Sequence, residues 1–186
     1  MDTVIGKQTD NKCLLTLLIP KTSFMLIRLI EKKNIESVNC EYEKIKQLLG
    51  RKIYQEIFRV VLTDNGGEFF DVNMFEMDYD SGEKISNLYY CDPHASWQKA
   101  NIEKNHHHIR EVIPKGVTME QFNQEEIKIL EDNINNIPRD ILDGKTPYEK
   151  TKELYPEFIQ LLNCDYIEPS EVNRSYMFIK SNEKEE

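Results

Sequence analysis

The sequence has 186 residues, enough for one good-sized domain with a buried core. Its 33 acidic and 24 basic residues give a formal net charge of −9, which by itself argues against a nucleic-acid-binding protein. It contains no apolar run long enough to cross a membrane and no pattern of a secretory signal, so we expect a cytoplasmic protein without a membrane partner. Its four cysteines lie far apart, which is typical of reduced structural thiols and not of a zinc site.

Three apolar segments near the start of the chain predict a small antiparallel sheet. They are Thr3–Ile5, Cys13–Ile19 and Phe24–Ile30. The second and third are joined by Pro20-Lys-Thr-Ser, which suits a tight hairpin connection. We therefore expect a three-stranded meander, with Asp2 at the start of its first strand.

A helix and a buried strand are expected next. Asn39 is a candidate N-cap for a helix that Gly50 would end. The segment Arg59–Thr63 is mostly apolar and β-branched, and Asp64 follows it in a glycine-rich turn. A crossover through the helix would bring this strand alongside the first one in parallel, so that Asp2 and Asp64 lie side by side. In the alternative interpretation Asp64 serves only the turn, because Asp, Asn and Gly all favour turns.

A helix over about Trp97–Val112 is expected to carry a third acidic residue, Glu103. No proline or glycine interrupts this run, and its isoleucines recur at helical spacing on one face, which we expect to be buried. On an adjacent face Glu103 shares a stripe with Lys99, His107 and Arg110. The alternative is a solvated charge pair on the helix surface.

The remaining segments predict one more strand and three helical segments. They are a strand at Leu88–Tyr90, helices opened by capping boxes at Asn123/Glu126 and Thr146/Glu149, and a weakly amphipathic segment at Phe158–Leu162. The fold class is therefore α/β, with a mixed five-stranded sheet of three antiparallel and then two parallel strands, and helices on both faces. We expect one domain over residues 1–155 and a partly disordered acidic extension over residues 156–186.

The acids Asp2, Asp64 and Glu103 come from three separate elements, which is what a pair of divalent cations requires. Hard cations bind carboxylate oxygens, and two cations about 3.5–4 Å apart can stabilise the attacking and leaving oxygens of a phosphoryl displacement. Their spacing alone does not show that the three acids meet.

Six short blocks of the sequence, in their order along the chain, carry a resemblance to a known family. They are Asp-Thr-Val-Ile-Gly (2–6), Thr-Asp-Asn-Gly-Gly-Glu-Phe (63–69), Asp-Pro-His-Ala-Ser-Trp-Gln-Lys (92–99), Ile-Glu-Lys-Asn-His (102–106), Ile-Pro-Lys-Gly (113–116) and Gly-Lys-Thr-Pro-Tyr-Glu (144–149). Together they resemble the signature blocks of the insertion-sequence-thirty family of bacterial transposases. The resemblance covers roughly residues 1–152 and implies an integrase-like catalytic core with a ribonuclease-H-like fold.

The resemblance implies that Asp2, Asp64 and Glu103 are the catalytic and metal-binding triad of a D-D-E transposase. It further implies metal-dependent DNA cleavage and strand transfer with two Mg²⁺ or Mn²⁺ ions. The partners would be DNA, as transposon ends and target, and further copies of the chain in a homo-oligomeric active complex in the bacterial cytoplasm. The spacing from Asp64 to Glu103 is slightly longer than is usual in the family, and the polar stretch Asp71–Lys84 can absorb the excess.

Several further side chains are candidates for a role at this site. Those expected to contact DNA are Trp97, Lys99, Lys104, Arg110 and Lys115. Asn65 and Glu68 are expected to support the metal ligands, with turn or surface roles as the alternative. The run His106-His107-His108 departs from the family pattern, and three successive helical positions point in three directions, so the three imidazoles cannot all serve one site.

Two other functions fit the same residues. The chain begins at the first acid of the triad and lacks the basic region expected upstream in such transposases, so it could be a truncated, inactive remnant or a regulatory fragment that binds a partner. A metal-dependent nuclease on the same fold is a further alternative, because a fold does not fix a function.

Overall fold

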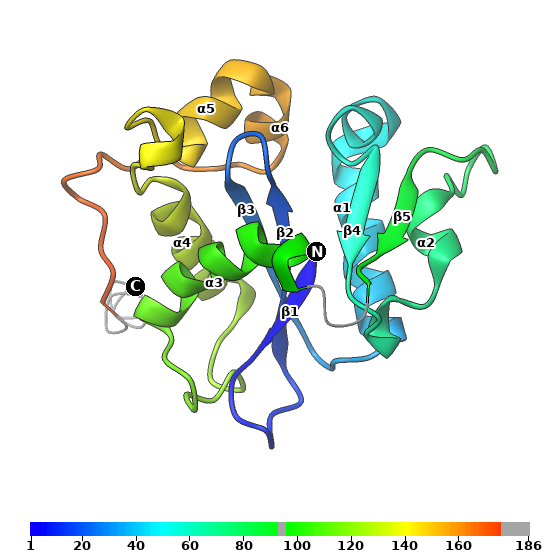
Figure 1. Cartoon of the computed structure of the whole chain (residues 1–186), viewed down its shortest axis with the longest axis horizontal. Coiled ribbons are helices and arrows are strands. Elements are labelled where there is room, and N and C mark those ends of the chain that lie inside the picture. Colours follow the sequence, from blue (N-terminus) through cyan, green and yellow to red (C-terminus); the bar gives the residue numbers. More distant parts are fainter. Residues whose placement is uncertain (93–95, 176–186) are drawn as a thin grey trace.

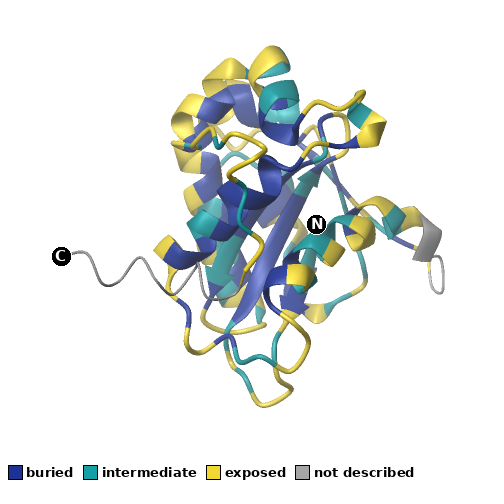
Figure 2. Ribbon diagram, turned by 90° about the vertical axis from the view of Figure 1, so that its left-hand side faces the viewer, coloured by how far each residue is buried: buried dark blue, intermediate teal, exposed yellow. Residues whose placement is uncertain are grey.

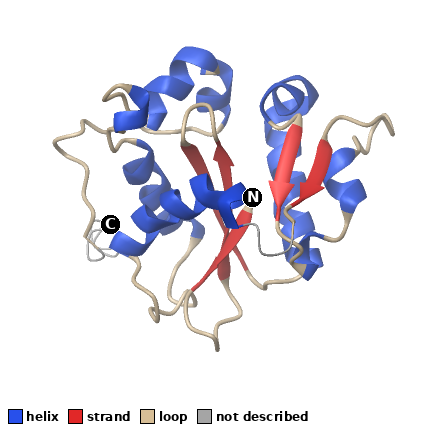
Figure 3. Ribbon diagram, in the orientation of Figure 1, coloured by secondary structure: helices blue, strands red, loops and turns tan. Residues whose placement is uncertain are grey.

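The computed structural model describes residues 1–92 and 96–175, and of Ser96 and Trp97 only the backbone. The first three strands are β1 (Asp2–Ile5), β2 (Cys13–Ile19) and β3 (Phe24–Ile30), and they form an antiparallel sheet in that order (Figures 1 and 3). In this register Asp2 lies opposite Thr16. The meander and the bounds of β2 and β3 are as predicted.

The last two strands form a separate sheet, so the prediction of one five-stranded sheet was wrong. β4 (Val60–Thr63) pairs with β5 (Asn87–Tyr90) in parallel, and within the described residues no strand ladder joins them to β1. Within the described residues β1 pairs with Cys13–Thr16, and a cavity of about 300 Å³ is lined by residues of both β2 and β4, among them Leu17 and Val61. One hydrogen bond of 2.6 Å, from the α-amino group of Met1 to the carbonyl oxygen of Leu62, connects the two sheets at this point. The chain is thus α/β with both strand orientations, and the ribonuclease-H-like arrangement remains a prediction.

The first helix, α1 (Ile35–Ile57), begins earlier and ends later than predicted. Its N-cap is Asn34, whose side chain accepts a hydrogen bond from the Ser37 amide, and not Asn39. Gly50 interrupts the regular helix with a positive φ of 67°, but the chain resumes as a helix beyond it. The reason is tertiary: the residues after Gly50 include Tyr54, which is fully buried and stabilises a turn that local propensity does not favour.

The other helices surround the two sheets. They are α2 (Val72–Glu76), α3 (Ala100–Val112), α4 (Gln124–Asn135), α5 (Pro147–Leu154) and α6 (Pro156–Leu161), with 3₁₀ turns at Gly67–Phe69, Ser96–Lys99 and Asp140–Leu142. Both predicted capping boxes are present, at the starts of α4 and α5. None of the helices in the described ranges is long and apolar enough to cross a membrane.

β2 and β3 are buried on both faces, and Figure 2 shows them mainly in dark blue among helices whose outer surfaces are exposed, whereas β1 is only partly buried. Alternation along β2 sends Leu15 and Leu17 to a core shared with α1 and α6, and Leu14 to a second core shared with α3 and α4. Phe158 of α6 is fully buried and packs edge-on against Phe24, with ring centroids 5.6 Å apart. The segment after residue 155 therefore contributes to the core, while the division of the chain at that residue stays a prediction.

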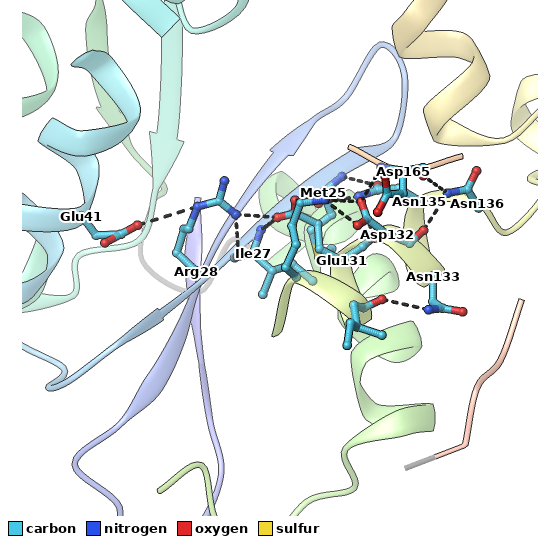
Figure 4. Close-up of polar contacts among 12 residues, drawn as sticks. Met25, Ile27, Arg28, Glu41, Glu131, Asp132, Asn133, Asn135, Asn136 and Asp165 are labelled. Carbon is cyan, nitrogen blue, oxygen red and sulfur yellow. Dashed lines mark hydrogen bonds and ion pairs between the residues drawn. The ribbon is translucent and has the colours of Figure 1, made fainter. Parts of the chain in front are cut away.

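The outer edge of β3 is covered by polar side chains of α4 instead of by another strand (Figure 4). Three backbone amides of β3 donate to them: Met25 to Asn135 (2.8 Å), Ile27 to Glu131 (2.6 Å) and Leu29 to Gln124 (2.8 Å). The Asn135 amide group also donates to the Met25 carbonyl oxygen at 2.9 Å, so this side chain binds Met25 as a neighbouring peptide group would. The backbone hydrogen-bonding groups at the edge of β3 are in this way satisfied by side chains of a helix.

Candidate functional site

Asp2 and Asp64 converge on the ammonium group of Lys99. Lys99 Nζ lies 2.9 Å from Asp2 Oδ2 and 3.0 Å from Asp64 Oδ2. The other oxygen of each carboxylate accepts a backbone N–H: that of Thr3 for Asp2, at 2.8 Å, and that of Gly66 for Asp64, at 3.0 Å. The turn after β4 therefore orients Asp64 through its own backbone, as Asp does in such turns. Each carboxylate keeps one oxygen directed at the same positive charge.

The charges at this point reinforce one another. Burial opposes the ionised form of Asp64, but hydrogen bonds from Lys99 and the Gly66 amide hold its pKa below the ordinary value. Burial likewise works against the charged form of Lys99, yet its bonds to the two carboxylates raise its pKa. Two carboxylates and one ammonium leave a net negative charge, and Asp64 remains 47% exposed to solvent. The cluster can therefore still attract a cation from solution.

Replacing Lys99 by Met is expected to destabilise the chain in EDTA by about 1–3 kcal/mol, because it leaves two facing carboxylates without their shared partner. The exposure of Asp64 puts the effect toward the lower end of this range. Urea unfolding measures it. Lys52→Met, which removes an exposed charge on α1, is the control, and a loss no larger than in that control would contradict the bridging role.

Glu103 lies on α3 one turn beyond Lys99, with its side chain exposed. Among the described residues, the group of acidic, His or Cys side chains whose ligand atoms all lie within 4.8 Å of one another is Glu131, Asp132 and Cys164. Asp2, Asp64 and Glu103 are not gathered to that distance. The structure thus brings two of the three predicted acids together and leaves the third on the wall of an adjacent groove.

This groove has a volume of about 1120 Å³ and lies between β1, the loop after it and α3. Besides Glu103, its lining includes the cations Lys7, Arg110 and Lys115. Arg110 is fixed in place by a 2.7 Å hydrogen bond from Nη2 to the Ile5 carbonyl oxygen. Basic side chains therefore collect beside the acidic pair although the chain as a whole carries −9.

His106 is the histidine of the triple run that faces the acids. Its Nε2 lies 2.8 Å from Thr16 Oγ1, and its Nδ1 lies 4.0 Å from Asp2 Oδ2. Burial is the main cause that lowers the pKa of His106 to about 4, so the imidazole is neutral near pH 7. His107 is 71% exposed, whereas His108 contacts Arg139. The three imidazoles have three different surroundings, as their consecutive positions on a helix require.

The two predicted supporting residues lie on the segments that carry the acids. Glu68 is buried, accepts a hydrogen bond from the Thr3 hydroxyl at 3.0 Å and forms an ion pair with Lys33. Asn65 donates to the Cys91 carbonyl oxygen at 3.2 Å and so ties the turn after β4 to the end of β5. Both fit a structural support of the acidic pair, and their role in a metal site stays a prediction.

The predicted DNA contacts separate in the structure. Arg110 and Lys115 line the groove, and Lys104 is exposed on α3. The Lys99 side chain is only 9% exposed and is bound to the two acids, so it does not offer its charge to a phosphate. The Trp97 side chain lies outside the described residues.

The sequence interpretation missed Lys7 and His106. It placed His107 on the face of Glu103, whereas the side chain that turns to Asp2 is His106, seven residues after Lys99. Seven residues are about two helical turns, so the spacing from Lys99 to His106 could have shown that they share a face. The position of Lys7 in the loop after β1 has no comparable periodic signal.

No protein-family model matches the chain, but several curated proteins are similar to it. The transposase for insertion sequence element IS4351 of Bacteroides fragilis is 31% identical over 155 residues, which are 83% of this chain and 44% of that protein. The transposase InsI for element IS30A of Escherichia coli K12 is 30% identical over 144 residues, 76% of this chain and 34% of that protein. A probable transposase for element IS1161 of Streptococcus salivarius is 27% identical over 158 residues, with shares of 83% and 40%.

The chain thus spans less than half the length of these relatives, while most of the chain takes part in each match. By this similarity it belongs to the transposases of bacterial insertion sequences, the family that includes the IS30 transposases.

Proposed function

We propose that the chain is the catalytic core of a transposase, which cuts DNA strands and joins them to a target with the help of two divalent cations, Mg²⁺ or Mn²⁺. The observation that carries the proposal is the convergence of Asp2 and Asp64 on a single positive charge beside a basic groove. Glu103, on the wall of that groove, is the third acid of the proposed site. DNA is the proposed substrate, as element ends and target.

The donor set fits such cations. Mg²⁺ and Mn²⁺ bind carboxylate oxygens, and Asp2 and Asp64 offer two that are already oriented by backbone amides. The Lys99 ammonium marks the point at which both carboxylates bind a positive charge. A cation that binds both acids must displace this ammonium, and we assign Glu103, one helical turn after Lys99 on α3, as the third acid of the set.

Each residue then has a defined task in the proposed reaction. Asp2 and Asp64 would hold the cations, with Glu103, on the wall of the adjacent groove, as the third acid. Bound cations would supply the activation of a water or a 3′-hydroxyl and the neutralisation of the transferring phosphate. Lys7, Arg110 and Lys115 attract the DNA backbone into the groove and position the scissile phosphate over the acids.

End recognition and assembly are proposals for the whole protein of which this chain matches a part. We propose that the active complex contains several copies of the chain and acts in the bacterial cytoplasm. Since the net charge of −9 opposes phosphate binding, the groove supplies local affinity, and sequence-specific binding of element ends requires other parts of such a protein.

The proposal is tested first by the metal dependence of stability. Mg²⁺ or Mn²⁺ at about ten times its dissociation constant is expected to raise the melting temperature by about 3–6 °C over that in EDTA, since a ligand of the native state stabilises it by mass action. Asp64→Asn should lose this increase, whereas Glu56→Gln, which changes an exposed acid on α1, should keep it. A melting temperature that is independent of metal, or a metal-induced increase in melting temperature that persists in Asp64→Asn, would contradict the shared cation site.

A further inference from the structure

We propose that His106 is a nitrogen ligand of the cation that Asp2 binds, so that the site favours first-row transition ions such as Mn²⁺ over Mg²⁺. This rests on the proposed function, because it assigns a further ligand and a metal preference to the same site. It makes the donor set a mixture of carboxylate oxygen and imidazole nitrogen.

The hydrogen bonds of Thr16 decide which nitrogen of His106 carries the proton. The Thr16 hydroxyl lies 3.0 Å from the Asp2 carbonyl oxygen, which can only accept, so the single hydroxyl proton is donated there. The 2.8 Å bond between Thr16 Oγ1 and His106 Nε2 must then use the proton of the imidazole. In the neutral ring the lone pair is consequently on Nδ1.

Nδ1 is the atom that faces the acid. It lies 4.0 Å from Asp2 Oδ2, and a cation with bonds of about 2.1 Å to each of two donors spans up to about 4.2 Å. Both proposed metal ligands are oriented by a hydrogen bond to their other polar atom. Asp2 Oδ1 accepts from the Thr3 amide, and His106 Nε2 bonds to the Thr16 hydroxyl. A ligand imidazole usually donates its second N–H to an oxygen in this way, which fixes its orientation toward the metal.

A nitrogen donor changes the ranking of metals at the site. Mg²⁺ binds oxygen ligands, whereas affinity for a site with a nitrogen donor rises along the first-row transition ions, an order that begins with Mn²⁺. The preference therefore resides in His106, while the two carboxylates bind either kind of cation. Loss of the imidazole should weaken Mn²⁺ binding about tenfold and change Mg²⁺ binding by less than about twofold, in keeping with the usual cost of losing one supporting group at a metal site.

The test measures Mn²⁺ and Mg²⁺ affinity by calorimetry, and Mn²⁺ coordination by pulsed electron paramagnetic resonance, which detects a coupled nitrogen nucleus. His106→Asn is the variant, because Asn can still donate to Thr16. His107→Asn is the matched control, since it removes the next imidazole on the same helix, which is 71% exposed. Nitrogen coupling is expected in wild type and in His107→Asn, and it is expected to disappear in His106→Asn together with the Mn²⁺ preference.

The outcomes separate the inference from the proposed function. Mn²⁺ that binds the wild type at a site lost in Asp64→Asn, but without nitrogen coupling and with equal affinity in His106→Asn, overturns the role of His106 and leaves the cation site standing. Absence of Mn²⁺ and Mg²⁺ binding in every variant overturns both. Should His106→Asn fail to fold, the spectrum of the wild type alone decides whether an imidazole is bound.

Discussion

Asp2→Asn, Asp64→Asn and Glu103→Gln are each expected to lower metal-dependent DNA cleavage and strand transfer by about 10³-fold or more. Each change replaces a carboxylate by a neutral amide and so removes a charge that, in the proposed reaction, holds a cation against the transferring phosphate. The measurement is nicking of a supercoiled plasmid, and joining of a pre-cut DNA end, in Mg²⁺ or Mn²⁺. Since the amide keeps the size of each side chain, the fold should survive. In Asp64→Asn the side-chain oxygen can still accept a hydrogen bond from the Gly66 amide.

Glu56→Gln provides the control, as Glu56 is exposed on α1, and it should retain wild-type turnover. Retention of activity in Glu103→Gln with loss in Glu68→Gln would show that Glu68, buried beside Thr3, is the third ligand and that Glu103 is not. If the wild type binds the metal but never cuts DNA, the inactive or regulatory fragment becomes the better interpretation of the chain.

Glu131→Ala is expected to lower the free energy of unfolding by about 2–4 kcal/mol, since it removes a buried acceptor of the Ile27 amide and leaves Arg28 with the longer, 3.7 Å ion pair to Glu41. The Glu131 side chain has no exposed surface, and its Oε2 accepts from the Ile27 amide and, at 2.8 Å, from Arg28 (Figure 4). Alanine would leave the Ile27 amide without its acceptor at the edge of β3, while Arg28 would keep Glu41 and the Ile27 carbonyl oxygen as partners. Urea unfolding of the variant and the wild type measures the difference.

Two further variants sharpen this result. Glu131→Gln retains an acceptor but not the charge, so it should cost less than Glu131→Ala. Glu125→Ala, an exposed acid in the first turn of the same helix, should cost less than about 1 kcal/mol. A loss in Glu131→Ala as small as in Glu125→Ala would mean that water replaces the carboxylate and that α4 does not hold the edge of β3.

Local patterns were sufficient for much of the fold. Largely apolar runs, each with a single polar residue, predicted β2 and β3 to the residue, because strands buried on both faces read as nearly continuous hydrophobic segments. The capping boxes at Asn123 and Thr146 predicted the starts of α4 and α5, because the hydrogen bonds involved join residues three positions apart. Tertiary contacts decided the rest: the turn after Gly50 is helical because Tyr54 is buried, and the two sheets remain apart because β1 is short.

The candidate site shows the same division. The predicted pairing of the Asp64 strand with the Asp2 strand is absent, yet both acids bind one ammonium. That the ammonium belongs to Lys99 and that His106 faces Asp2 depends on how α3 is rotated against β1 and β2. Helical spacing defines the faces of a helix, but packing selects which face meets the sheet.

The side chains of α4 also determine how fast the backbone amides of β3 exchange their hydrogens with solvent, and whether another chain can pair with this strand. The amides of Met25, Ile27 and Leu29 should exchange slowly with deuterium although no strand in the described part of the chain pairs with this edge, because each is bonded to α4. Their exchange should report the detachment of that helix, and Glu131→Ala should accelerate it at Ile27 most of all. A strand of another molecule, from a second copy of the chain or from a peptide, can pair with β3 only after α4 has detached. The helix therefore protects this edge of the sheet against aggregation.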